Sequence, residues 1–361
     1  MHDSISRLAA GRFMVTRTDR LGDMILTGPL FDGIKQSFPR SHLTVLASAV
    51  NAAVAGMHPA VDEVIVDGVE ARDSGWRGTL ALARVLRRHR PDVIMFANAK
   101  HRLAVAALLA RIPIRIGSAR RRYSILYTQR MPASAEPDVV HETDLTLSML
   151  GALGVDCKPG AAGRLQVPEA DRGFVDTLLA GLAAPGNKGL AVVHPSNSGN
   201  ALNASTSWYA RLVDELAEAG YTVVLTGTEA DREHAAAVVE SAHYVPLDLS
   251  GRLSVGQLAA LHARSSLCVG SSTGPTHLAA AVGAPTVGLY APLSKQQKWL
   301  PRGAAVAVLQ PEVGMTCPSC LGPRCRHYNC MELIPTRDVV AAGTALTEKM
   351  GSDPTQSCQK V

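Results

Sequence analysis

A strand-to-helix turn is encoded by Val269-Gly270-Ser271-Ser272-Thr273-Gly274-Pro275-Thr276-His277-Leu278. The apolar residues around Val269 read as the end of a strand. Pro275 suits the first position of a helix, because its missing N–H would be unpaired there anyway. The first turn of a helix presents free backbone N–H groups and a partial positive charge, and Gly270 and Gly274 leave room beside the main chain. The stretch therefore predicts either a phosphate site or only a tightly packed turn.

Short apolar runs alternate with helical patterns along the chain, which is typical of βαβ units and parallel sheets. The runs expected to form strands are 12–17, 42–47, 62–66, 92–96, 113–116, 189–194, 221–226, 243–246, 266–269 and 285–289. The helical patterns are 29–37, 77–89, 101–110, 140–153, 207–219, 229–240, 254–262 and 275–282. The sequence thus predicts an α/β protein with two doubly wound sheets.

The length of 361 residues is comfortable for two domains and long for one core. A short helix flanked by turn-forming residues separates the two halves. We expect an N-terminal Rossmann-like domain over 1–168, a linker over 169–188, a C-terminal Rossmann-like domain over 189–349 and a flexible tail over 350–361. Ligands of such sheets bind beyond the carboxyl ends of the strands, so substrates are expected in a cleft between the domains.

Asp23 is the candidate catalytic residue. It follows the first expected strand and Gly22, ahead of a helix that begins at or before Pro29. A carboxylate at this place can accept a proton from a substrate hydroxyl, or it can simply cap a helix. The residues alone leave both roles open.

Two loops of the second half carry candidate ligand-binding groups. The loop containing Ser196 and Asn197 follows an apolar strand, and its hydroxyl and amide groups suit either phosphate oxygens or a plain turn. Glu229 comes after the next strand, where a carboxylate can accept both hydroxyls of a ribose or favour the first turn of a helix. His277 lies one turn into its helix, where it is either a diphosphate contact or an ordinary helix histidine.

Six segments resemble glycosyltransferase family 9, the lipopolysaccharide heptosyltransferases, and they occur in the order that the family has them. They are the first strand with Leu21-Gly22-Asp23, Ile112-Pro113-Ile114-Arg115-Ile116-Gly117, His194-Pro195, Ser207-Trp208-Tyr209, the turn at 270–278, and Cys330-Met331-Glu332-Leu333-Ile334. Together they span nearly the whole chain. The resemblance implies the GT-B architecture, in which two Rossmann-like domains face each other.

The resemblance also implies roles. Asp23 would be the base of an inverting transfer, and Glu229 would hold the ribose of the donor. The residues implied to hold the phosphates are Ser196, Asn197, Ser272, Thr273, Gly274 and His277. The implied donor is a nucleotide-diphosphate sugar, ADP-heptose, and the implied acceptor is a lipopolysaccharide core or a similar anionic glycolipid. No metal would be required, since groups at a helix terminus can neutralise the leaving diphosphate.

Two positions depart from the family pattern. The family commonly has Asp where this chain has Ser272, and Lys where it has Thr206. Without this acidic and this basic side chain, the identity of the donor sugar stays open. Diphosphate binding is not removed, since backbone groups can provide it. Two rival functions are kept: a nucleotide-sugar epimerase on the same fold, and a non-catalytic nucleotide-sugar-binding protein.

Four of the seven cysteines lie close together, at Cys317, Cys320, Cys325 and Cys330, with His327 among them. Their density fits a structural zinc site, although the spacing is not that of a standard knuckle, and free thiols shaping a loop fit as well. Disulfides are disfavoured in a reducing cytoplasm.

The net charge of +5 is distributed unevenly, with arginine clusters at 84–90 and 111–130. Such clusters suit anionic lipid, a phosphorylated acceptor or nucleic acid, or they are solvated surface. No nucleic-acid-binding motif accompanies them, so nucleic acid is the least favoured partner. The chain shows neither a secretory signal nor an apolar run long enough to span a bilayer. We therefore expect a cytoplasmic protein in peripheral contact with the inner face of the inner membrane.

Overall fold

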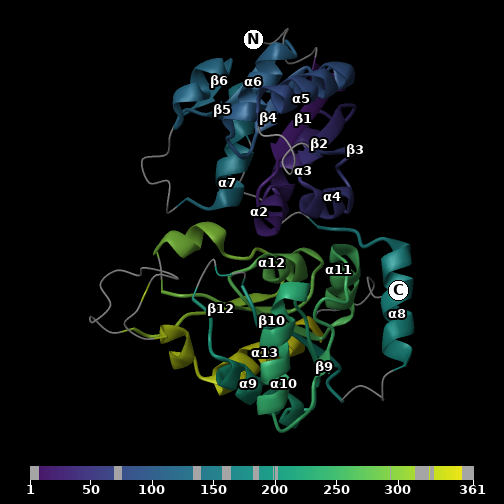
Figure 1. Ribbon diagram of the computed structural model, residues 1–361, viewed down its shortest axis with the longest axis vertical. Helices are drawn as coiled ribbons and strands as arrows, with labels where there is room; N and C mark the ends of the chain where they lie inside the picture. The colour runs from purple at the N-terminus through teal and green to yellow at the C-terminus, as the bar shows by residue number, and fades with distance from the viewer. Residues whose placement is uncertain are drawn as a thin grey trace. The chain divides into compact units, whose positions relative to one another are not determined.

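The computed structural model describes residues 8–68, 75–132, 140–156, 164–181, 187–197, 199, 202–292, 294–313, 325 and 329–351. The chain folds into two compact units, Met1–Gln166 and Val167–Val361, each built on its own parallel sheet (Figure 1). Both are α/β units of the Rossmann-like type, as the alternation of strands and helices predicts.

The N-terminal sheet has the order β3-β2-β1-β4-β5-β6. Its strands are β1 (Arg12–Arg17), β2 (His42–Ala47), β3 (Glu63–Val66), β4 (Val93–Phe96), β5 (Ile114–Ser118) and β6 (Gln129–Met131). The inner strands β1, β2 and β4 are almost entirely buried, because helices cover both faces of a parallel sheet. The order reverses between β1 and β4, and a doubly wound sheet places its ligands at such a point.

The helices of this unit fall on opposite faces of the sheet, since right-handed crossovers change face where the strand order reverses. On the way from β1 to β3 the chain forms α2 (Leu21–Leu26), α3 (Gly28–Ser37) and α4 (Ala49–Gly56). On the way from β3 to β6 it forms α5 (Trp76–His89), α6 (His101–Leu109) and η2 (Arg122–Leu126). The remaining elements are η1 (Leu8–Ala10), α7 (Glu142–Leu147) and η3 (Ser148–Leu153).

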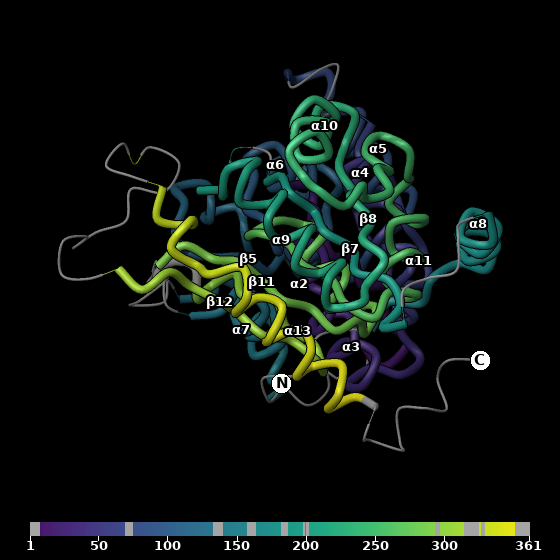
Figure 2. The backbone as a smooth tube through the Cα atoms, turned by 90° about the horizontal axis from the view of Figure 1, so that it is seen from below, coloured from purple at the N-terminus to yellow at the C-terminus, as the bar shows by residue number. Residues whose placement is uncertain are grey.

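The C-terminal sheet repeats this plan in the order β12-β11-β10-β7-β8-β9. Its strands are β7 (Leu190–His194), β8 (Thr222–Leu225), β9 (Leu247–Asp248), β10 (Leu267–Ser271), β11 (Thr286–Leu289) and β12 (Val306–Leu309). Its helices are α8 (Glu169–Ala180), α9 (Thr206–Glu218), η4 (Glu229–Asp231), α10 (Arg232–Ser241), α11 (Val255–Arg264), α12 (Gly274–Ala281), η5 (Ser294–Trp299), η7 (Cys330–Leu333) and α13 (Thr336–Gly351). Helix α13 packs against α9, β11 and β12 (Figure 2).

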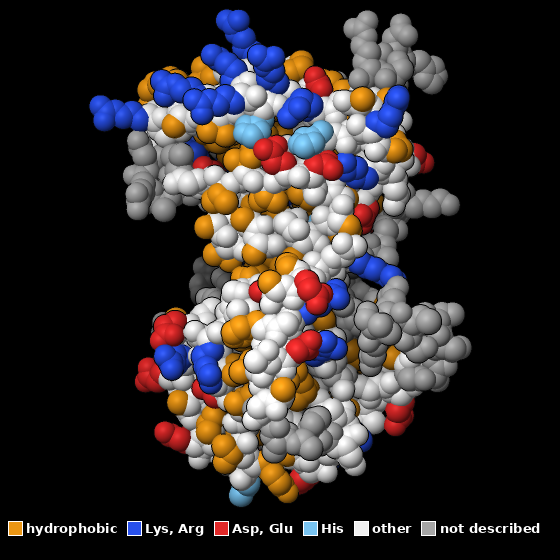
Figure 3. All heavy atoms as spheres, turned by 90° about the vertical axis from the view of Figure 1, so that its right-hand side faces the viewer, with side chains coloured by type: hydrophobic (Ala, Val, Ile, Leu, Met, Phe, Trp, Pro, Cys, Tyr) orange, Lys and Arg blue, Asp and Glu red, His pale blue; other side chains and the backbone are white. Residues whose placement is uncertain are grey.

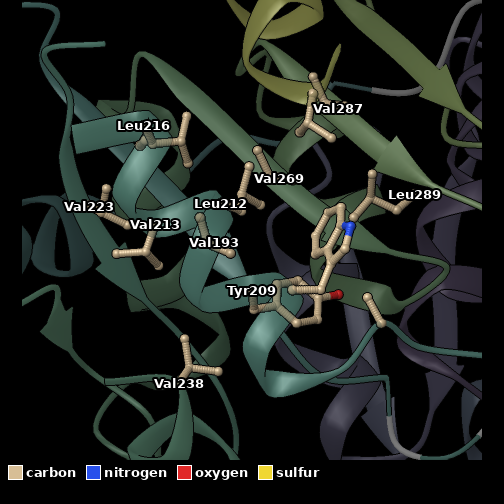
Figure 4. Close-up of a cluster of buried hydrophobic side chains, with 14 of the residues drawn as sticks. Val193, Tyr209, Leu212, Val213, Leu216, Val223, Val238, Val269, Val287 and Leu289 are labelled. Carbon is tan, nitrogen blue, oxygen red and sulfur yellow. The ribbon is translucent and has the colours of Figure 1, made fainter. Parts of the chain in front are cut away.

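The core of the C-terminal unit lies between α9 and the sheet, where side chains from β7, β8, β10 and β11 meet (Figure 4). Trp208 is buried there, and its indole Nε1 donates a hydrogen bond to the carbonyl oxygen of Ile334 at 2.8 Å. Two segments that are far apart in the sequence are therefore fixed to each other: the start of α9 and the turn after η7.

The structure differs from the sequence-based expectation in several elements. The strand expected at 243–246 forms instead at β9, since Tyr244 and Val245 are exposed and Pro246 lacks an N–H for pairing. The helix expected at 229–240 divides into η4 and α10, and the helix expected at 140–153 divides into α7 and η3. The sequence pattern did not predict the helices α2, α4 and α13, the strands β6 and β12, or the short helices η1, η2, η5 and η7. The tail beyond residue 351 lies outside the described residues.

Candidate active site

Asp23 lies in the first turn of α2, immediately after β1 and beside the point where the order of the N-terminal sheet reverses. Its side chain is 15% exposed. A carboxylate near a helix N-terminus is stabilised by the helix dipole, but the structure shows a stronger local partner in the last residue of β1.

Arg17 ends β1 with its guanidinium buried among three carboxylates. Its Nη2 lies 3.0 Å from an oxygen of Asp23, its Nε lies 2.8 Å from Asp19, and its Nη1 lies 2.8 Å from Glu142 of α7. The same Nη1 donates to the carbonyl oxygen of Ala97 at 2.9 Å. Each of the three guanidinium nitrogens lies within 3.0 Å of a carboxylate oxygen, so Arg17 fixes the position of Asp23 by ion pairing.

The pKa of Asp23 is raised above its ordinary value, mainly because burial disfavours the charged form. Arg17 and Arg20 lower the pKa of Asp23, while the negative charges of Asp19 and Glu142 raise it. Because three carboxylates share one guanidinium, the pKa of Asp23 is higher than it would be if Arg17 paired with Asp23 alone. A buried carboxylate of raised pKa is a suitable proton acceptor.

The sequence patterns do not point to Arg17, Asp19 or Glu142 as site residues. Arg17 carries a weak signal, since a charged residue in an otherwise apolar strand must find a partner. Glu142 is 125 positions from Arg17, and nothing in the sequence connects the two.

The candidate donor-binding loops of the C-terminal unit follow three neighbouring strands. β10 pairs with β7, and β7 pairs with β8, so the loops after these strands leave the same edge of the sheet. The order of this sheet also reverses here, between β7 and β10. The structure therefore brings together the predicted residues of all three loops at the edge where a doubly wound sheet holds its ligand.

The turn after β10 leads directly into α12, which begins at Gly274, one residue before the expected start. Thr273 is its extended N-cap, and its side chain makes no capping hydrogen bond. Gly270 has a packing role: a Cβ there would lie 2.5 Å from the hydroxyl of Thr276, which itself donates to the Ser271 carbonyl oxygen at 2.6 Å. Gly270 is thus needed for packing within the turn, and its expected role in letting phosphate approach the backbone stays a prediction, as does that of Gly274 at the helix N-terminus.

Ser272 and His277 lie at this same helix terminus. The side chain of Ser272 hydrogen-bonds to the buried hydroxyl of Tyr290, and burial raises the pKa of Tyr290. His277 is 5% exposed, within the first turn of α12. Thr206, the other position that departs from the family pattern, is the first residue of α9.

Ser196 and Asn197 are buried, and both are engaged within the protein. The Ser196 hydroxyl lies 3.3 Å from Nε2 of His194 and also bonds to Asp231. The Asn197 amide accepts from the Gly199 N–H at 3.1 Å and donates to the Leu202 carbonyl oxygen at 3.2 Å. These contacts show loop-forming roles for both residues.

Glu229 is the first residue of η4, and its side chain is 72% exposed. One carboxylate oxygen accepts from Arg232 at 2.9 Å. The capping of η4 is done by Thr228 and Asp231, which form a capping box, so Glu229 is not needed as a cap. Gly251 leaves the room that its other oxygen occupies, since a Cβ there would approach that oxygen to 2.4 Å.

The cysteine cluster is only partly visible. Cys325 is half-buried and Cys330 is buried, whereas Cys317, Cys320 and His327 lie outside the described residues. Within the described residues, no group of three or more metal-binding side chains comes together.

Comparison with known proteins places the chain in a family. The model of glycosyltransferase family 9 (heptosyltransferase) matches residues 79–320, more than half of the chain. The chain belongs to this family. A protein of Haemophilus influenzae, named as a candidate glycosyltransferase, is 29% identical over 304 residues, covering 80% of this chain and 86% of its own.

Solved structures of the family share the fold. A family 9 glycosyltransferase of Veillonella parvula superposes with a TM-score of 0.81 at 23% identity, covering 95% of this chain and 98% of its own. The Escherichia coli ADP-heptose lipopolysaccharide heptosyltransferase II superposes with a TM-score of 0.78 at 21% identity, covering 94% of this chain and 100% of the E. coli chain. The protein is therefore a heptosyltransferase-like glycosyltransferase with the GT-B fold.

Proposed function

We propose that the protein is an inverting glycosyltransferase that transfers heptose from ADP-heptose to an anionic glycolipid such as a lipopolysaccharide core. In this reaction Asp23 takes the proton of the acceptor hydroxyl as its oxygen attacks the anomeric carbon of the donor. The bond to the nucleoside diphosphate breaks, and the diphosphate leaves with the bonding electron pair. A positioned general base of this kind contributes roughly 10²–10⁴-fold to the rate.

One observation carries the proposal: Asp23 is largely buried, its pKa is raised, and its ion pair with Arg17 fixes its position. An aspartate that served only to cap a helix would need neither the guanidinium nor the surrounding carboxylates. The resemblance of its turn to the Leu-Gly-Asp turn of the family supports the same role.

The proposed donor site is the edge formed by the loops after β7, β8 and β10. Free N–H groups in the first turn of α12 would bind the diphosphate, with Ser272, Thr273, Gly274 and His277 around it. Glu229, exposed and not needed for capping, would accept the ribose hydroxyls. Ser196 and Asn197 would shape the adjoining loop and present its backbone to the phosphates. The name of the E. coli neighbour, which specifies ADP-heptose, supports ADP as the nucleotide.

The proposal is tested by measuring release of ADP from ADP-heptose with and without deacylated core oligosaccharide. Asp23→Asn keeps the shape of the side chain but cannot take a proton, so it should abolish transfer while leaving the affinity for ADP-heptose nearly unchanged. Conversion of the donor into an epimeric ADP-sugar without acceptor and without net release of ADP would favour the epimerase alternative. Donor binding without any turnover in the parent protein would favour the non-catalytic alternative, and turnover retained in the variant would place the base elsewhere.

A further inference from the structure

One segment of the N-terminal unit holds most of its positive charge. Between residues 76 and 131 the chain has 13 Lys and Arg residues and a single acid, Asp92, although the remaining residues together hold more acids than bases. This segment includes α5, α6 and η2, which pack side by side along one face of the sheet. We call the outer surface of these three elements the arginine layer. Figure 3 shows Lys and Arg side chains gathered over the N-terminal unit.

Most arginines of this segment are exposed to solvent; the two exceptions are Arg102, which pairs with Asp67, and Arg115, which is half-buried. Ten of them are exposed: Arg77, Arg84, Arg87, Arg88, Arg90, Arg111, Arg120, Arg121, Arg122 and Arg130. Within the part of the chain that the structure describes, none of these ten forms an ion pair with a carboxylate. Helix α5 buries Thr79, Leu82, Ala83 and Leu86, so its arginines follow the opposite side. Unneutralised like charges repel one another, and an anionic partner would relieve that repulsion.

Two of these arginines occupy backbone positions that glycine fits better. Arg90 and Arg111 lie at the C-terminal ends of α5 and α6 with φ of 47° and 61°. The left-handed region disfavours residues with a Cβ, while a cation near a helix C-terminus is favourable. Replacing both by glycine therefore removes two charges and relieves backbone strain at the same time.

Each element of the arginine layer also exposes one large apolar side chain. Trp76 of α5 is 61% exposed, Leu108 of α6 is 42% exposed, and Ile125 of η2 is 76% exposed. Surfaces that combine basic residues with exposed Trp, Leu or Ile are typical of proteins that lie on an anionic bilayer, where the apolar groups enter the headgroup region. No helix in the described part of the chain is long and apolar enough to cross a membrane.

We infer that the arginine layer binds the surface of an anionic lipid bilayer, with Trp76, Leu108 and Ile125 entering the interface. Nucleic acid fits less well, because single strands are held by stacking of bases on exposed rings. Tyr127 is buried and stacked on Phe96, and the hydroxyl of Tyr123 donates to the Ala99 carbonyl oxygen. Among the Phe, Tyr and Trp residues of this fully described segment, Trp76 alone is largely exposed.

Vesicle co-sedimentation tests this inference without depending on the reaction. The full chain should sediment with vesicles of phosphatidylethanolamine and phosphatidylglycerol, and much less with vesicles lacking the anionic lipid. The α5 variant Arg77→Gln, Arg84→Gln, Arg88→Gln should lower the partition coefficient by roughly a hundredfold, since each basic residue near an anionic leaflet contributes about fivefold. A matched variant in the C-terminal unit, Arg172→Gln, Arg211→Gln, Arg337→Gln, removes the same charge from exposed positions and should bind as the parent does.

Two further variants separate the inference from simpler explanations. Arg90→Gly with Arg111→Gly should weaken vesicle binding without lowering the melting temperature, which excludes misfolding as the cause. Ile125→Ser should weaken binding at unchanged charge, whereas Val245→Ser, at an exposed valine of the C-terminal unit, should not. Equal losses in the matched control variants would overturn the inference, as would tighter binding to a single-stranded oligonucleotide than to anionic vesicles. So would a raised Michaelis constant of the α5 variant for deacylated, lipid-free acceptor, which would make the layer an acceptor site.

Discussion

Nη2 of Arg17 lies 3.0 Å from the carboxylate of Asp23, while Nη1 of the same guanidinium lies 2.8 Å from Glu142. The two carboxylates therefore compete for one buried cation. The negative charge of Glu142 raises the pKa of Asp23 and so opposes the lowering caused by Arg17. Arg17 can therefore hold Asp23 in place without making it a weak base. This relationship separates the positioning of Asp23 from the tuning of its pKa, and each can be tested on its own.

Replacing Glu142 tests the tuning. Glu142→Gln removes a negative charge that raises the pKa of Asp23, so this pKa should fall. Asp23 acts as a base when deprotonated, so the acid limb of the kcat/KM profile should move to lower pH. A less basic Asp23 should also reduce kcat on the neutral plateau. Glu240→Gln, at an exposed glutamate of α10, is the matched control and should leave the profile unchanged. An acid limb that does not move in Glu142→Gln would remove Glu142 from the tuning of Asp23.

Replacing Arg17 tests the positioning. Arg17→Met leaves three carboxylates near one another without their cation, and breaking a buried ion pair in this way typically destabilises a protein by about 3–5 kcal/mol. In the variant, burial and mutual repulsion would keep the folded-state pKa values of the carboxylates above their unfolded values. The destabilisation should therefore be largest at neutral pH and should shrink as the pH falls and the carboxylates take up protons. Urea unfolding at several pH values measures this, and a loss that does not depend on pH would contradict the account.

Much of this architecture is predictable from the sequence, because buried parallel strands read as continuous apolar runs. The strands at 12–17 and 42–47 form over those same residues, and most other expected elements differ by one or two positions. The segment 243–246 was mistaken for a strand because Tyr244 and Val245 favour strands, whereas the structure exposes them. Helix α2 was missed because it is only six residues long and joins α3 at Thr27.

The candidate site was less predictable than the fold. Asp23, Glu229 and the 272–277 turn lie at the ends of strands, where a sequence pattern can point to them. The contacts that decide their chemistry join residues far apart in the chain, such as Arg17 with Glu142 and Ser272 with Tyr290. Such pairs depend on strand order, and an apolar pattern does not specify strand order.

The proposed role of the α12 N-terminus in donor binding can be tested by a substitution at Gly274. Gly274→Val places a branched side chain at the first residue of α12, where the proposed diphosphate approaches the backbone. Affinity for ADP measured by calorimetry should fall at least tenfold, because a displaced diphosphate loses backbone hydrogen bonds of about 1.5–3 kcal/mol each. Gly173→Val is the control, since this glycine of α8 has nothing within 4 Å of its Cβ position. Unchanged affinity in Gly274→Val would remove the α12 terminus from the donor site.

The arginines after β5 give a last prediction, which concerns the acceptor. Arg120, Arg121 and Arg122 are exposed and follow the carboxyl end of β5, the edge of the N-terminal sheet at which Asp23 also lies. An acceptor with phosphate or carboxylate groups would be attracted to them over about one Debye length, ~8 Å at physiological ionic strength. Changing all three to Gln should raise the Michaelis constant for deacylated acceptor and flatten its dependence on salt.

Donor affinity provides the internal control for this variant. The proposed donor residues belong to the other unit, so the affinity for ADP-heptose should stay at the parental value. The α5 variant Arg77→Gln, Arg84→Gln, Arg88→Gln removes the same charge from the arginine layer and should leave the soluble acceptor's Michaelis constant unchanged. Parallel losses for donor and acceptor in the Arg120–Arg122 variant would indicate misfolding. If neither constant changes, the three arginines have no part in acceptor binding, and the acceptor's anionic groups must be held elsewhere.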